Sequence, residues 1–89
     1  MPAALGDLRA IGVFIGQDNP AAAERQIEIV FASVAQLARF PESGRLGRWL
    51  GTRELMIPRT PYIVPYQLRG DAVLLLRVLH GRQRWPDRV

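Results

Sequence analysis

The chain has 89 residues, of which 48% are hydrophobic, and this fits one small domain with a single core. It contains no cysteine, which excludes disulfides and cysteine-ligated metal sites. All 12 basic residues are arginine: residues 1–44 carry three against five carboxylates (net −2), and residues 45–89 carry nine against three (net +6). The basic half favours an acidic or nucleic-acid partner there, or else it is a solvated surface of an arginine-rich protein.

Residues 3–40 are predicted to form a helical hairpin. In the first helix, apolar side chains recur at three- and four-residue spacing from Leu5 to Ile15, and Gly16 is placed to end it. The second helix begins at Asn19-Pro20, because asparagine caps helices and proline fits the first helical position. It stops at Pro41. Its apolar stripe comprises Ala23, Ile27, Val30, Val34, Leu37 and Ala38.

Residues 41–51, with three glycines and little periodicity, are predicted to be a connector loop. Trp49 and Leu50 are its large apolar side chains before Gly51. We expect both side chains to be buried at one edge of the core. The alternative for Trp49 is a role in recognition.

Residues 52–80 are predicted to form a three-stranded antiparallel sheet. Runs at 52–57, 62–68 and 72–79 are rich in β-branched, aromatic and aliphatic residues and are bounded by proline and glycine. The links are too short for parallel crossovers, so the strands form a meander. The third run is apolar on both of its faces, and one helical hairpin can cover only one. Pro65 argues for an edge position or a bulge in the second.

These elements predict a single α+β domain over residues 1–89, with the helical hairpin packed on the meander and a basic-aromatic tail at 81–89. The segments that follow are specific enough to identify a family: DLRAI, FIGQDNPAAAERQIEIV, LARFPESGRLG, GTRELMIPRTPYIVPYQL and AVLLLRVLHGRQRWP. Nearly the whole chain resembles the RelE/ParE superfamily of bacterial toxins, the toxic halves of type II toxin–antitoxin modules, also described as plasmid-stabilisation proteins. The resemblance implies a compact α/β fold and a cognate antitoxin that wraps the toxin.

The chain departs from the family pattern at its start. Members usually have a β-strand before the first helix, whereas Met1 lies almost at the segment that follows this strand. Its absence would reflect a late start codon, truncation or real loss, and would leave an unpaired sheet edge. We therefore expect a homodimer or a toxin–antitoxin hetero-oligomer.

The resemblance leaves two mechanisms open. One branch of the superfamily cuts messenger RNA on the ribosome; here Arg53, Arg59, Arg77 and His80 would be the catalytic groups, as cations and as an acid–base residue. The other branch poisons DNA gyrase without known catalysis of its own, and the LHGRQ ending looks more like this branch. We favour gyrase inhibition, with a disarmed member that only binds antitoxin as a third possibility.

The gyrase hypothesis places the target-contacting residues in the basic-aromatic end of the chain: His80, Arg82, Gln83, Arg84 and Trp85. The tail has a plain alternative, a frayed terminus whose Trp85 folds back on the core. His80 has one too, a hydrogen bond to a carbonyl at the turn before Gly81. Glu54 is expected to pair across strands with Arg77 or Arg59.

The antitoxin is expected to present an acidic segment with apolar anchors. It would lie against the helical hairpin and the sheet, at Arg53, Arg59, Arg77, Ile27 and Val34. The sequence predicts no metal site, no cofactor and no phosphate-binding loop. No apolar run approaches the ~20 residues of a membrane span, and no signal peptide is visible, so a cytoplasmic protein without a membrane partner is expected.

Overall fold

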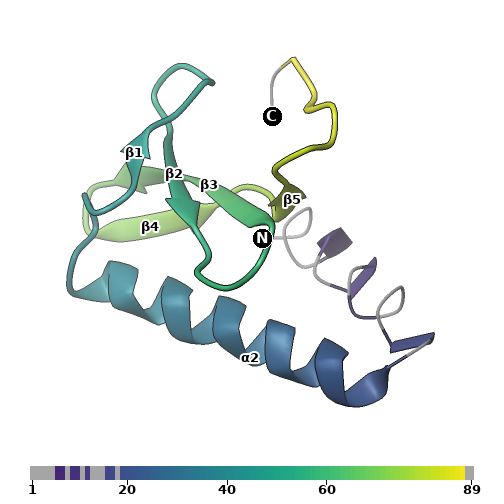
Figure 1. The fold of residues 1–89 in the computed structure, drawn as a ribbon. Coiled ribbons are helices and arrows are strands. Elements are labelled where there is room, and N and C mark those ends of the chain that lie inside the picture. The colour runs from purple at the N-terminus through teal and green to yellow at the C-terminus, as the bar shows by residue number, and fades with distance from the viewer. Residues whose placement is uncertain (1–5, 8, 11, 13–15, 18, 88–89) are drawn as a thin grey trace.

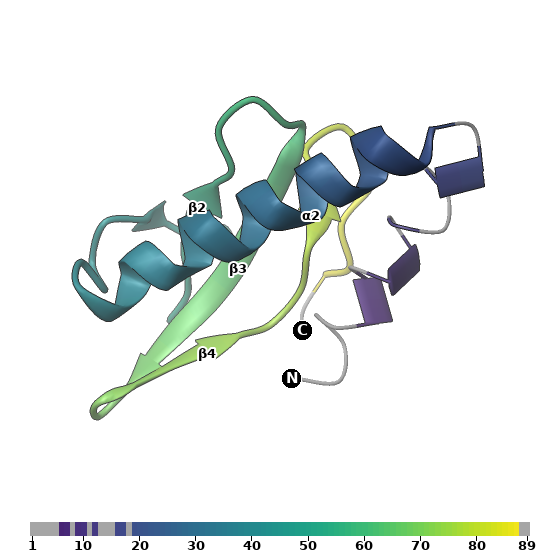
Figure 2. The same ribbon diagram turned by 90° about the horizontal axis from the view of Figure 1, so that it is seen from below.

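In a computed structural model of the chain, one long helix packs against an antiparallel sheet (Figures 1 and 2). The structure describes residues 6–7, 9–10, 12, 16–17 and 19–87. The elements are α2 (Pro20–Ala35), a 3-10 helix (Gln36–Ala38), β1 (Arg45–Leu46), β2 (Arg53–Met56), β3 (Tyr62–Arg69), β4 (Ala72–Leu75) and β5 (Leu79–His80). The predicted α+β class is confirmed.

Helix α2 begins where the sequence predicts. The Oδ1 atom of Asn19 accepts a hydrogen bond of 3.0 Å from the Ala22 N–H, and Pro20 is the first helical residue. The helix ends at Ala35, earlier than predicted, and the 3-10 turn carries the chain on to Ala38. In the region of the predicted first helix, the described residues at 6–7, 9–10, 12 and 16–17 are helical. Its apolar stripe (Leu5, Leu8, Ile11 and Ile15) lies outside the described residues.

The sheet is the predicted meander with one strand added. Its order is β1-β2-β3-β4, every pair is antiparallel, and β5 also pairs with β3. Strand β1 lies within the predicted connector loop, where Arg45 pairs with Glu54 and Leu46 with Arg53. The interpretation of 41–51 as pure loop is therefore wrong, because a two-residue strand has no periodicity that the sequence could reveal.

The third predicted strand is interrupted by a bulge. On β3 the partner of Tyr66 is Leu75, and the partner of Ile63 is Leu79. Between these two pairs, residues 64 and 65 of β3 lie opposite three residues, 76–78. One extra residue on one side of a strand pair is the pattern of a β-bulge. The Pro65 carbonyl accepts from the Leu76 N–H at 2.9 Å on this side. The missing N–H of Pro65 thus falls at the break between β4 and β5, which accounts for a proline in a central strand.

Both faces of the sheet are covered, each by a different part of the chain. Alternation along β3 puts Tyr62 and Val64 on the α2 face. They form a buried cluster with Val30, Ile57 and Val78. On the opposite face, here called the second face, a smaller cluster contains Trp49, Ile63, Leu79 and Trp85. The C-terminal tail, yellow in Figure 1, lies on the side of the sheet away from α2. Through Trp85, the tail covers apolar side chains of the second face, which a helical hairpin on the α2 face could not reach.

Tyr66 ties the segment after α2 to the sheet. Its side chain is fully buried, and its hydroxyl accepts from the Gly44 N–H at 2.8 Å and donates to the Pro41 carbonyl at 2.8 Å. A Cβ at Gly44 would lie 2.6 Å from the Tyr66 ring, so glycine is required there for close approach.

Replacing Tyr66 by phenylalanine should therefore reduce the free energy of unfolding by about 1–3 kcal/mol, because a buried N–H loses its acceptor. Chemical denaturation measures this loss. Tyr62→Phe is the matched control, since the Tyr62 hydroxyl makes no such bond within the described part of the chain. Equal losses in the two variants would contradict the role assigned to the Tyr66 hydroxyl.

Candidate functional site

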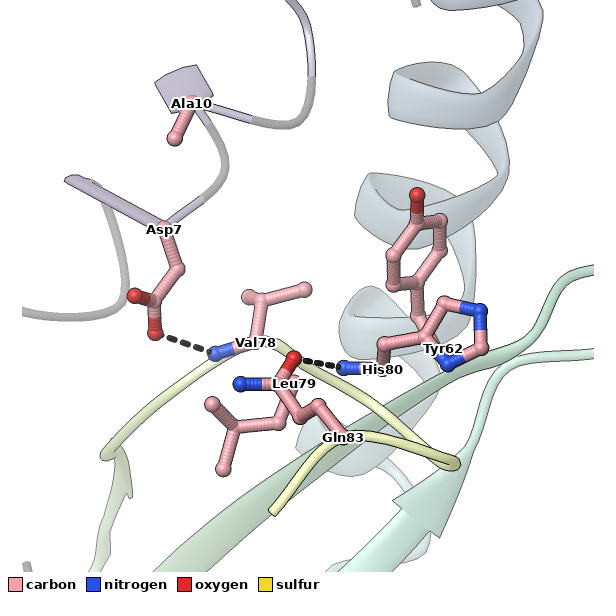
Figure 3. A pocket seen from close by; sticks show the side chains of 7 residues that line it. All are labelled: Asp7, Ala10, Tyr62, Val78, Leu79, His80 and Gln83. Carbon is pink, nitrogen blue, oxygen red and sulfur yellow. Dashed lines mark hydrogen bonds between the residues drawn. The ribbon is translucent and has the colours of Figure 1, made fainter. Parts of the chain in front are cut away.

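A pocket of about 340 Å³ opens where β5 pairs with the start of β3 (Figure 3). It is lined by Asp7, Ala10, Tyr62, Val78, Leu79, His80 and Gln83. Its polar groups come from three separate parts of the chain: the segment before α2, strand β3, and the end of the chain from β5 onward.

His80 is held by the turn that follows it. Its Nδ1 accepts a hydrogen bond of 3.0 Å from the Arg82 N–H, and its own N–H donates to the Gln83 side chain at 2.7 Å. Its ring meets Tyr62 edge to face, with centroids 5.9 Å apart. Burial raises the pKa of Tyr62, which keeps that phenol neutral. The plain alternative for His80 was a bond to a carbonyl at this turn, and the structure has a bond from a backbone N–H there. Because Nδ1 is the acceptor, the ring proton of neutral His80 belongs on Nε2.

Arg77, the residue at the bulge, is paired with Asp7. The Arg77 Nε and Nη2 atoms lie 2.6 and 2.8 Å from the two Asp7 carboxylate oxygens, and the Val78 N–H donates to the same group at 2.9 Å. The hydrogen bonds with Asp7 raise the pKa of the Arg77 guanidinium, and burial opposes them. The predicted pairing of Glu54 with Arg77 or Arg59 is wrong.

Glu54 instead binds two arginines of the β1–β2 hairpin. Its carboxylate is 3% exposed. Oε1 accepts from Arg45 at 3.0 and 3.2 Å, and Oε2 accepts from the Arg48 N–H at 2.8 Å and the Arg48 Nε at 3.2 Å. Burial alone would raise the pKa of Glu54. The bonds from the Arg48 backbone and from both guanidinium groups outweigh it, so the pKa lies below its usual value.

The same hairpin holds the C-terminal tail. The Arg48 guanidinium lies 3.5 Å over the Trp85 ring, and the rings of Trp49 and Trp85 are 5.4 Å apart. The Trp49 Nε1–H donates to the Pro86 carbonyl at 2.9 Å, and the Trp85 Nε1–H donates to the His80 carbonyl at 3.2 Å. We call Arg45, Arg48, Trp49, Glu54 and Trp85 the hairpin–tail clasp. Trp85 does fold back on the core.

Leu50 does not share the buried position predicted for it beside Trp49. Trp49 is buried as expected, but Leu50 is fully exposed at the tip of the hairpin. Gly51 follows it with φ +73°, in the left-handed region, and this turns the chain so that Leu50 points outward.

The remaining predicted site residues lie in different surroundings. Arg53 donates to the Glu42 and Gly44 carbonyls at 3.2 and 2.9 Å. Arg59, in the β2–β3 turn, lines a groove on α2 with Arg25. The proposed antitoxin contacts Ile27 and Val34 are half-buried and pack against the core.

The tail residues Arg82, Gln83 and Arg84 are exposed, His80 is half-exposed, and Trp85 is buried. Within the described residues, no group of three or more potential ligands could hold a metal ion. In that same part of the chain, no helix is long and apolar enough to cross a membrane.

The ionisation of Glu54 should make the clasp sensitive to acid. Because the pKa of Glu54 is lower in the folded than in the unfolded chain, its contribution to stability is present above the usual pKa of 4.5 and is lost as the pH falls through the folded pKa. Wild type should therefore lose more free energy of unfolding than Glu54→Gln between pH 6 and 3. Parallel urea titrations measure the difference, and coincident pH profiles would contradict it.

Three comparisons place these features among known proteins. Residues 1–85 match the family model described as "ParE toxin of type II toxin-antitoxin system, parDE". The chain is 45% identical over 84 residues to "Putative toxin Y4kP" of Sinorhizobium fredii, covering 94% of this chain and 86% of that protein. It is 35% identical over 78 residues to "Toxin RelE2" of Caulobacter vibrioides, covering 88% and 86%. A solved structure titled "Chromosomal ParDE TA system from P. aeruginosa" shares the fold, with a TM-score of 0.82 at 24% identity over 90% of this chain and 89% of that one.

Proposed function

Because the chain belongs to the ParE toxin family of type II toxin–antitoxin systems, we propose that it arrests growth by binding and inhibiting DNA gyrase. Family membership makes it the toxin of such a pair, with a cognate antitoxin as its partner. Gyrase as the target is our proposal, made from the ParE family model and from the LHGRQ ending.

The surroundings of the four candidate ribonuclease groups carry this proposal. Arg53 binds carbonyls after α2, Arg59 lies beside α2, and Arg77 is neutralised by Asp7. His80 lies in the pocket of Figure 3 without Arg53 or Arg59. Cleavage of RNA needs an acid–base pair and cations around one phosphate. Cations that lie outside the His80 pocket, as Arg53 and Arg59 do, or that are already paired, as Arg77 is, favour a protein that acts by binding.

The direct test is a supercoiling assay with purified gyrase, relaxed plasmid and the purified chain. We expect inhibition that is reversed by the cognate antitoxin. In cells, induction without antitoxin should halt DNA synthesis and induce the SOS response. Immediate arrest of translation with cut messages, and gyrase that stays active, would overturn the proposal.

The alternative function is a ribosome-dependent endoribonuclease, and one observation favours it. The side chains of His80, Tyr62 and Asp7 line a single pocket, and side chains of these types transfer protons in enzymes. In that case His80→Ala should reduce message cleavage roughly 10²–10⁴-fold, the usual contribution of an acid–base group. A disarmed toxin, the third possibility, would bind antitoxin without arresting growth.

For the antitoxin we propose an acidic segment with apolar anchors. Three exposed apolar side chains are more accessible to such anchors than the half-buried Ile27 and Val34. They are Phe31 on α2, and Leu46 and Leu50 on the β1–β2 hairpin. Arg53 and Arg59 stand near these surfaces as cations. Strand β4, which pairs only with β3 among the described elements, could accept a strand from the antitoxin or from a second copy.

A further inference from the structure

We propose that Glu54 and Arg48 are positioning residues for toxicity, because they hold Trp85 against the second face and so fix Arg82, Gln83 and Arg84 as a preformed contact surface. The inference rests on the proposed function in one respect, namely that the tail contacts the target. Its other part, the docking of the tail by the clasp, is a physical property of the chain alone.

The first step is the buried carboxylate. Glu54 uses both oxygens, one for Arg45 and the other for Arg48, and the Arg48 backbone N–H is bound as well as its side chain. The bonds from the Arg48 backbone N–H and from its Nε both go to Oε2 of Glu54, and together they hold the guanidinium beside this carboxylate. Glu54 of strand β2 therefore sets the position of this guanidinium.

The second step is the stack on the tail. The Arg48 guanidinium lies 3.5 Å from the centre of the Trp85 ring, and Trp85 is itself buried against Trp49, Ile63 and Leu79. A guanidinium that is already oriented and partly desolvated stacks on an aromatic face more strongly than a free one. Glu54 thus acts on Trp85 through Arg48.

The third step is that the tail has few other restraints. After β5 the described chain forms no helix or strand. Apart from the local bonds of the turn at His80, made by the Arg82 and Gln83 N–H groups and the Gln83 side chain, its backbone bond to the sheet is that of Gly81 to Pro61. The two indole N–H groups supply two more bonds, to Pro86 and to His80. Loss of the clasp should therefore release the tail without unfolding the sheet.

The fourth step links docking to binding. The exposed residues 82–84 lie between two fixed points, His80 at the end of β5 and Trp85 in the clasp. A segment held at both ends loses less conformational entropy when a partner binds it. Glu54 and Arg48 touch no target in this scheme, and act by ordering the residues that do.

The test compares Glu54→Gln and Arg48→Gln with Glu28→Gln and Arg25→Gln. The two controls make the same chemical changes at exposed positions on α2. Two readouts report docking without reference to any target: the exciton couplet of the Trp49–Trp85 pair in circular dichroism, and the rate of trypsin cleavage after Arg82 or Arg84. Toxicity is read as the toxin level that arrests growth, and a cooperative urea transition checks that each variant is folded.

We expect both clasp variants to lose most of the couplet and to be cleaved in the tail about tenfold faster or more, as expected for a locally released segment. Arrest should require about tenfold more toxin, because the contact surface is no longer preformed. The α2 controls should behave as wild type. If Glu54→Gln shows no cooperative transition, Arg48→Gln decides.

Two results would overturn the inference: variants that keep the couplet and the slow cleavage, or variants with a released tail that arrest growth as wild type does. The supercoiling assay on the wild-type chain separates failure of this inference from failure of the proposed function. Growth arrest without gyrase inhibition would refute gyrase as the target. The clasp variants would still be compared with wild type by the toxin level that arrests growth. A wild-type chain that arrests no growth would refute both.

Discussion

Replacing Arg82, Gln83 and Arg84 together by alanine should lower gyrase inhibition about 100-fold or more while leaving antitoxin affinity unchanged. All three side chains are exposed, so their loss removes contacts to a target; the one internal bond lost with them is that from the His80 N–H to Gln83 at the turn. Arginines at the centre of an interface commonly contribute about 1–2 kcal/mol each or more, and about 1.4 kcal/mol corresponds to a tenfold change in affinity. Keeping Trp85 preserves the cover of the second face, which deletion of residues 81–89 would remove.

His80 supplies the matched comparison, because binding and catalysis make opposite demands on it. His80→Asn keeps a side-chain acceptor for the Arg82 N–H, which the imidazole Nδ1 now provides. A toxin that acts by binding should lose no more than about tenfold, which corresponds to about 1.4 kcal/mol for one contact with the target. A ribonuclease with His80 as acid or base should lose about 10²–10⁴-fold in cleavage with the same change. Full toxicity in the triple alanine variant together with loss of toxicity in His80→Asn would refute the gyrase proposal.

The parts of the fold that the sequence predicts are those fixed by neighbouring residues. Asn19 and Pro20 specify the start of α2 through local geometry, and the β2–β3–β4 meander follows from short links between β-rich runs. Apolar residues on both faces of 72–79 also showed that a second layer of cover was needed. They could not show that the tail supplies it, because that depends on where the chain returns after β5.

The partners of the charged side chains were not predictable, and the reason is register. Glu54 meets Arg45 because a two-residue strand, β1, pairs with β2 at that position. Arg77 leaves the sheet because one extra residue at 76–78 interrupts the pairing of β3 with β4 and β5. A shift of one residue exchanges the faces of a strand. Ion pairs inferred from strand alternation alone therefore fail at the bulge.

The Asp7–Arg77 pair should be costly to break. The two side chains are 16% and 27% exposed, and they join residues 70 positions apart in the sequence. Asp7 binds the guanidinium at two points and also accepts from the Val78 N–H, so it satisfies the backbone where the bulge leaves it unpaired. Replacing Asp7 by alanine should reduce the free energy of unfolding by about 2–4 kcal/mol, since it leaves a partly buried cation and an N–H without partners.

That loss is large against a total stability of roughly 5–15 kcal/mol for a domain of this size. Urea denaturation of Asp7→Ala, Arg77→Ala and the double variant measures it. Asp71→Ala, at the exposed β3–β4 turn, is the control and should change stability by about 0.5 kcal/mol or less. The double variant should lose less than the sum of the two single losses, because each removes the same pair. Additive losses, or an Asp7→Ala variant no less stable than Asp71→Ala, would show that the segment before α2 is not anchored at the bulge by this carboxylate.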